Sequence, residues 1–149
     1  MRKIVSIAIV TGLFLVNACS KSDNSSGNTT PDKTAKTVQN LSGSYNITAS
    51  TANLFGLTLN LYDSLPACQR DNIIQLDTNL TAQFIDAGTP CVPPTDSTGK
   101  WSLSSNSDTI YVAGESSFIK SWDGTTLVLA TTINFMGVPV NATSTFVKK

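Results

Sequence analysis

The cysteines are the residues of this sequence with the widest choice of chemistry. There are three, Cys19, Cys68 and Cys91, and the chain contains no histidine. A thiol can act as a nucleophile, bind a metal, carry a lipid or form a disulfide. Without histidine, Ser-His-Asp catalysis, Cys-His catalysis and histidine-ligated metal sites are excluded. Lipid attachment and disulfide formation are therefore the chemistry expected of these thiols.

The carboxylates are the other groups that could do chemistry, but their spacing forms no site pattern. Those beyond residue 41 are scattered, mostly at expected turns or strand ends: Asp63, Asp71, Asp77, Asp86, Asp96, Asp108, Glu115 and Asp123. Aspartates at turns typically accept hydrogen bonds from backbone N–H groups. Two could meet as a glycosidase-like pair, although no motif indicates it. No EF-hand loop, phosphate-binding glycine loop or metal-spaced cluster occurs. We expect no catalytic residue, no metal, no cofactor and no enzyme.

The N-terminus has the pattern of an export signal. Met1-Arg2-Lys3 is basic, and the apolar run from Ile4 to Val16 is shorter than the about 20 residues that span a bilayer. The following Val16-Asn17-Ala18-Cys19 resembles the lipobox of bacterial lipoproteins. This resemblance implies removal of a signal peptide, residues 1–18, and attachment of acyl chains such as palmitate at Cys19, which would anchor the protein to a membrane. The alternative is an ordinary signal peptide followed by an unrelated cysteine.

Residues 19–40 are expected to form a disordered tether. The segment is rich in Ser, Thr, Asn and Lys, and Val38 is its largest apolar residue. Such a segment cannot bury enough apolar surface to offset its conformational entropy. Ser20 stands where an inner-membrane lipoprotein usually has Asp, so we expect the outer membrane, with the periplasmic and cell-surface faces both open.

The charge of the chain argues against nucleic acid as a partner. Ten basic and ten acidic residues become eight and ten once Arg2 and Lys3 leave with the signal peptide, a net charge of −2. No basic stripe or cluster occurs, and nucleic-acid binding requires one.

The remaining residues, 41–149, have the composition and periodicity of one all-β domain. Apolar residues alternate over segments separated by turn residues, as in half-buried strands. Strands are expected at 44–50, 54–62, 125–135 and 138–147, with Pro139 indicating an edge or a bulge. Further hairpins are expected around residues 104–108 and at Asp123-Gly124. No helix longer than about one turn, near residues 63–67, is expected.

A hairpin centred on Asp77-Thr78-Asn79 is supported by two independent patterns. Ile74 and Leu76 lead into this turn, and Leu80, Ala82 and Phe84 lead out of it. Residues paired across a hairpin are equidistant from its turn, and Cys68 and Cys91 meet this condition. In an oxidising compartment they are expected to form a disulfide that closes the open end of the hairpin, rather than remain free thiols.

About eight strands in simple sequential order favour an antiparallel up-and-down barrel. A sheet of about eight strands can close on itself, and a closed barrel has no exposed edge strand. A two-sheet sandwich is the alternative, but the short loops between neighbouring strands favour the barrel.

Several motifs in order resemble the lipocalin-like lipoproteins of Gram-negative bacteria. "LSGSYNIT" is similar to the Gly-x-Trp/Tyr opening of such domains, with Tyr45 in place of the more usual Trp. "CQRDNIIQL", the later Cys with "TGKWSLSSNSDTIYV", and "SFIKSWDGTTLVL" resemble the motifs that follow. The resemblance covers most of residues 41–149 and implies a lipocalin-like β-barrel domain. It implies little about chemistry, because most members of the family lack an assigned ligand.

An eight-stranded barrel is just wide enough to be filled by side chains or to hold one small ligand. Large apolar residues on inward strand faces are the candidate ligand contacts: Phe84, Trp101, Ile110, Trp122, Leu129, Ile133 and Phe135. A one-residue error in register would turn Tyr111 and Trp122 outward or inward. The first hypothesis is a membrane-anchored module that binds a small apolar or amphipathic molecule. The second is a structural or protein-interaction module of the envelope whose barrel is filled by packed core.

Overall fold

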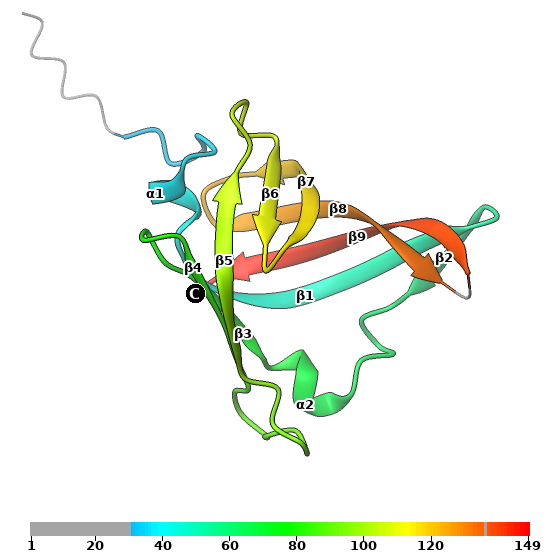
Figure 1. The fold of residues 1–149 in the computed structure, drawn as a ribbon. Coiled ribbons are helices and arrows are strands. Elements are labelled where there is room, and N and C mark those ends of the chain that lie inside the picture. Colours follow the sequence, from blue (N-terminus) through cyan, green and yellow to red (C-terminus); the bar gives the residue numbers. More distant parts are fainter. Residues whose placement is uncertain (1–30, 136) are drawn as a thin grey trace, which may run out of the picture. The chain divides into compact units, whose positions relative to one another are not determined.

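The computed structural model describes residues 31–135 and 137–149. Within them the chain forms antiparallel strands with two helices of one turn each (Figure 1). The strands are β1 Gly43–Leu54, β2 Leu57–Asn60, β3 Ile73–Leu76, β4 Thr81–Ile85, β5 Ser97–Leu103, β6 Thr109–Val112, β7 Glu115–Trp122, β8 Thr126–Phe135 and β9 Val138–Lys148. The helices are α1 Val38–Leu41 and α2 Ala67–Arg70. No helix in the described part of the chain has the length and apolarity needed to cross a membrane.

Eight of the strands close into an antiparallel barrel, as the sequence predicts. β3 to β9 follow one another in order, and β1 lies between β3 and β9. The β1–β9 pairing runs from Tyr45 opposite Lys148 to Asn53 opposite Asn141 and closes the ring. The predicted second strand is shorter than expected and lies outside the ring, because β2 pairs with the far half of β1 alone.

The three predicted hairpins are confirmed. In the first, Ile74 pairs with Phe84 and Leu76 with Ala82 around the turn at residues 77–80. β5 and β6 form the second and β7 and β8 the third. At the third turn Asp123 Oδ1 accepts hydrogen bonds from the backbone N–H of Thr126 (2.7 Å) and Thr125 (2.8 Å). These bonds hold the pKa of Asp123 at about 2, well below that of a free carboxyl.

One end of the barrel is closed by the segment before β1. Leu41 of α1 is fully buried, and its carbonyl oxygen accepts a hydrogen bond from the Tyr45 hydroxyl (2.8 Å). The Trp122 indole N–H donates to the Lys33 carbonyl (2.9 Å), and Lys148 Nζ donates to the Asn40 carbonyl (2.9 Å). Residues 31–40, which the sequence places in the tether, therefore contact the barrel. Val38 is the apolar residue by which this segment contacts the core, and Leu41, three residues further on the same turn of helix, is buried beside it.

The expected signal peptide, Cys19 and the expected tether as far as residue 30 lie outside the described residues, as does Met136, between the strands expected at 125–135 and 138–147. Residues 31–149 form a compact unit by themselves. This unit contains the closed barrel and its apolar core.

At the other end, part of the sheet extends beyond the ring. β3 pairs with β1 only as far as Asn46, and β7 pairs with β8 only as far as Ala130. The parts of β1, β2, β8 and β9 beyond these points form a four-stranded extension, which we call the arm (Figure 1). Pro139 lies in the arm where β9 pairs with β8 alone, so of the two predicted alternatives, an edge or a bulge, the structure shows an edge.

Candidate ligand-binding cavity

A cavity of about 270 Å³ lies inside the barrel. Strand alternation turns mainly apolar side chains into it: Tyr45, Ile74, Leu76, Phe84, Ile110, Val112, Ala113, Leu127, Leu129 and Phe146. Ser117 and Glu115 are its polar neighbours. The space remains because large inward residues stand opposite small ones on the next strand, as Ile110 does opposite Ser117 and Leu129 opposite Ser144. The barrel is therefore not filled by its own side chains.

Aromatic side chains fill the closed end beneath the cavity. Trp101 is 2 % exposed, and its indole N–H donates to the Asp77 carbonyl (2.8 Å). Tyr45 and Trp122 have ring centroids 6.3 Å apart, and Lys148 Nζ lies 5.7 Å from the Trp122 ring centroid. Burial raises the pKa of the Tyr45 hydroxyl further above its ordinary value, and this hydroxyl donates a hydrogen bond to the Leu41 carbonyl. Among the described residues, packed aromatic side chains thus close this end of the cavity.

A second hollow, about 360 Å³ in volume, adjoins the cavity toward the open end. The two share Ile74, Phe84 and Phe146 as walls. More neutral polar residues line the second hollow than line the cavity: Gln69, Asn72, Thr95 and Ser97. The lining therefore gains neutral polar groups from the inside of the barrel toward its mouth, while apolar residues still form much of it.

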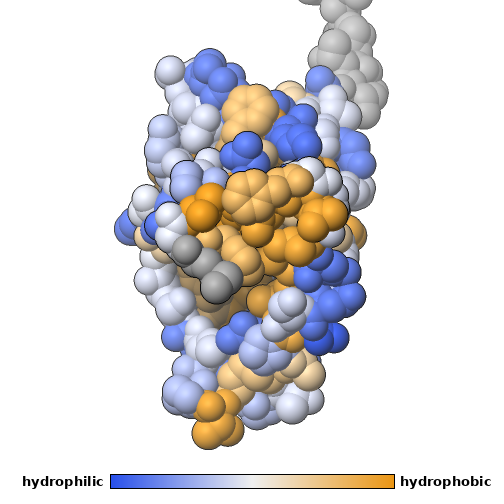
Figure 2. Space-filling model, turned by 90° about the vertical axis from the view of Figure 1, so that its right-hand side faces the viewer, coloured by the Kyte–Doolittle hydropathy of each residue, from blue (hydrophilic) through white to orange (hydrophobic). Residues whose placement is uncertain are grey.

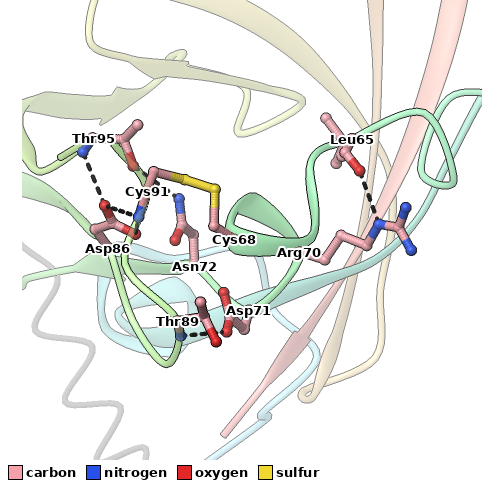
Figure 3. Close-up of a disulfide and its surroundings, with 9 residues drawn as sticks. All are labelled: Leu65, Cys68, Arg70, Asp71, Asn72, Asp86, Thr89, Cys91 and Thr95. Carbon is pink, nitrogen blue, oxygen red and sulfur yellow. Dashed lines mark hydrogen bonds between the residues drawn. A yellow bond between two sulfur atoms is a disulfide. The ribbon is translucent and has the colours of Figure 1, made fainter. Parts of the chain in front are cut away.

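The polar wall of the mouth is held by the disulfide between Cys68 and Cys91 (Figure 3). It joins α2 to the loop after β4, with 5.2 Å between the two Cα atoms. Asp86 Oδ2 accepts hydrogen bonds from the backbone N–H of Cys91 (3.0 Å) and Thr95 (3.1 Å). The predicted disulfide across the open end of the β3–β4 hairpin is confirmed, and it fixes two loops that line the second hollow.

A family model described as a lipocalin-like domain matches residues 41–129. The chain belongs to this lipocalin-like family. The match runs from Leu41, which closes the barrel floor, to Leu129, which lines the cavity. Comparison with curated proteins and with solved structures gives no match.

The lipocalin-like barrel brings together only part of the predicted ligand contacts. Phe84, Ile110 and Leu129 line the cavity. Trp101 and Trp122 also point inward, but they belong to the packed core at the closed end. The two remaining residues, Ile133 and Phe135, lie on the arm, where they pack against a separate apolar cluster of Ala52, Val140 and Ala142.

Several lining residues of the lipocalin-like barrel were not among the predicted contacts. Leu127 shares the inward face of β8 with Leu129, so alternation alone could have indicated it. Phe146 lies opposite Leu127 on β9 and faces the cavity with it. Strand alternation could not have indicated Glu115, which follows the β6–β7 turn. Its position at the mouth of the cavity depends on the orientation of the β6–β7 hairpin.

Most acidic residues of the barrel serve in turns. Asp77 accepts hydrogen bonds from the side chains of Gln75 (3.0 Å) and Gln83 (2.9 Å). A hydrogen bond from the Thr109 hydroxyl is the main cause of the lowered pKa of Asp108. Within residues 31–135 and 137–149, no cluster of three or more Cys, Asp or Glu residues could hold a metal ion. Of the described residues that line the two hollows, Glu115 alone is an acid or a base.

Proposed function

We propose that this lipocalin-like protein binds a small apolar or amphipathic molecule inside its barrel, at the cell envelope, while anchored by a lipid on Cys19. The observation that supports binding is the open apolar cavity of about 270 Å³. Transfer of apolar surface from water into such a cavity contributes roughly 25 cal/mol per Å². The role proposed is binding and not catalysis, because the chain has no histidine and its described acids mostly serve in turns.

The lining also indicates the class of ligand. The cavity volume is near the lower end of the roughly 300 to 1,000 Å³ that small-molecule pockets have, which suits a small ring system, and the adjoining hollow adds the room that one acyl chain needs. No lysine or arginine lines either hollow among the described residues, so a buried carboxylate would lack a charged partner. Neutral polar side chains at the mouth, such as Asn72 and Ser97, suit an uncharged hydrogen-bonding head group.

We expect residues 31–149 to take up a fluorescent long-chain alcohol saturably, with one site per protein. The matched fluorescent fatty acid should bind at least several-fold more weakly, because Glu115, the only charged group among the described lining residues, would repel its carboxylate. Titration of each probe, followed by fluorescence, measures both affinities.

Failure of every probe in a broad lipid panel would contradict ligand binding and favour the structural or protein-interaction module. Tighter binding of the fatty acid than of the alcohol would contradict the proposed class of ligand while leaving the cavity as the site.

The proposed anchor rests on the N-terminal sequence. The basic start, the apolar run and Val16-Asn17-Ala18-Cys19 together support export, removal of residues 1–18 and lipid attachment to Cys19. The Cys68–Cys91 disulfide agrees with this, since disulfides persist in oxidising compartments such as the periplasm and the cell surface. Ser20 after the lipidated cysteine supports the outer membrane as the destination.

In a bacterial host that processes lipoproteins, the full chain should incorporate labelled palmitate, and Cys19→Ser should abolish the label. The reason is that the thioether can form only on the sulfur of this residue. Fluorography of the purified chain measures the label, and the matched control is the double variant Cys68→Ser with Cys91→Ser, which should keep it. A label that persists in Cys19→Ser would show that the anchor is elsewhere.

A further inference from the structure

The far end of the arm exposes three apolar side chains. Phe55 and Leu57, at the β1–β2 turn, are 88 % and 69 % exposed, and Val138, the first residue of β9, is 40 % exposed. We call these three residues the apolar tips. β9 pairs with β1 as far as Asn141, so the β1–β2 turn and the start of β9 project from the same end of the arm. Figure 2, which views this side of the molecule, shows apolar residues gathered around a hollow.

The backbone at Phe55 is unfavourable for the residue found there. Phe55 has φ of 50° and Gly56 has φ of 82°, two consecutive positive values as in a type I′ hairpin turn. Asn, Asp or Gly usually occupies the first of these positions, and a bulky residue there is an outlier. In the isolated domain, neither the backbone conformation at position 55 nor the exposure of its side chain favours phenylalanine. Its side chain is therefore expected to contact something outside the barrel.

The arm contains no charged residue. Residues 37–62 and 124–147, which include the whole of the arm, have no Asp, Glu, Lys or Arg, although 13 % of the chain is charged. The exposed side chains near the tips, such as Thr58, Asn60 and Asn141, are neutral groups that form hydrogen bonds. Apolar tips beside neutral polar side chains can enter the interface of a bilayer without desolvating a charge.

We propose that the arm docks on a lipid surface, with the apolar tips inserted among the acyl chains. Three projecting side chains suit a soft, planar surface. A second copy of the chain is a poorer occupant, because a stable protein interface buries about 1,200 to 2,000 Å² in total and three projecting side chains would bury much less. The arm extends the barrel at its open end, so docking would bring the mouth of the cavity to the membrane. The proposal depends neither on the lipid at Cys19 nor on ligand binding.

The test measures partitioning of residues 31–149 onto phosphatidylcholine vesicles by co-sedimentation. The double variant Phe55→Asn with Leu57→Thr should lower the partition coefficient at least tenfold. Its thermal midpoint should be unchanged or higher, since asparagine suits a positive φ in this turn. A loss of binding without a loss of stability is a result that a merely structural role of Phe55 would not produce.

The matched control is Phe118→Thr, which removes an aromatic residue that is 51 % exposed on β7, within the wall of the barrel. This variant should partition as the wild type does, and binding should change little with salt because the arm is uncharged. Three results would overturn the proposal: equal partitioning of the double variant, a wild type that stays in the supernatant, or binding that requires anionic lipid. A dimer that forms without lipid and is lost in the double variant would overturn it in favour of a second copy.

Discussion

Replacement of both Cys68 and Cys91 by serine is expected to lower the free energy of unfolding by about 3 to 4 kcal/mol. The two residues are 23 positions apart, and cross-links that close loops of this size reduce the entropy of the unfolded chain by about that amount. For a domain of this length the loss corresponds to a fall in Tm of roughly 10 °C or more. Thermal and denaturant unfolding of the variant and the wild type measure it.

The variant should also weaken the mouth of the cavity. The disulfide joins α2, which bears Gln69 and is followed by Asn72, to the loop that bears Thr95, and these residues line the second hollow. Reduction of the wild type is the natural control: it should lower the stability as the mutations do, and reductant should leave the double variant unaffected. Equal stability of the oxidised wild type and the double variant would contradict the prediction.

The fold could be predicted from the sequence because strand alternation and turn chemistry are local signals. Asp123-Gly124 fixed one hairpin, and the positions of Cys68 and Cys91 supported another. The packing of α1 could not be predicted in the same way, since Val38 and Leu41 are too few to form an apolar pattern. The segment is also held by carbonyl oxygens that accept hydrogen bonds: Leu41 from Tyr45, Lys33 from Trp122 and Asn40 from Lys148. Trp122 and Lys148 lie far along the chain, so no local pattern indicates these bonds.

The cavity was harder to predict than the barrel. Alternation identifies inward positions, but it does not indicate how far along the barrel axis a residue lies. For this reason Trp101 and Trp122 share a face with true lining residues and yet fill the closed end, while Ile133 and Phe135 extend past the ring onto the arm. The axial position depends on where β7 stops pairing with β8 and where β3 stops pairing with β1, which no local pattern specifies.

The largest effect on binding is expected from Val112→Trp, which should weaken the affinity for the long-chain alcohol at least tenfold, or by about 1.4 kcal/mol. Val112 ends β6 and lines the cavity, so an indole at this position would occupy the space that the ligand needs. Because the added side chain enters a void and does not displace packed atoms, the free energy of unfolding should stay within about 1 kcal/mol of the wild type.

Tyr111→Trp is the matched control, because Tyr111 is the neighbouring residue of β6, points outward and is 43 % exposed. The same side chain is thus placed one residue away on the opposite face of one strand, and only the inward one should block the ligand. Loss of affinity in both variants would indicate damage to β6 and not occupation of the cavity. If Val112→Trp still bound the probe at one site with unchanged affinity, the binding site would have to lie outside the barrel.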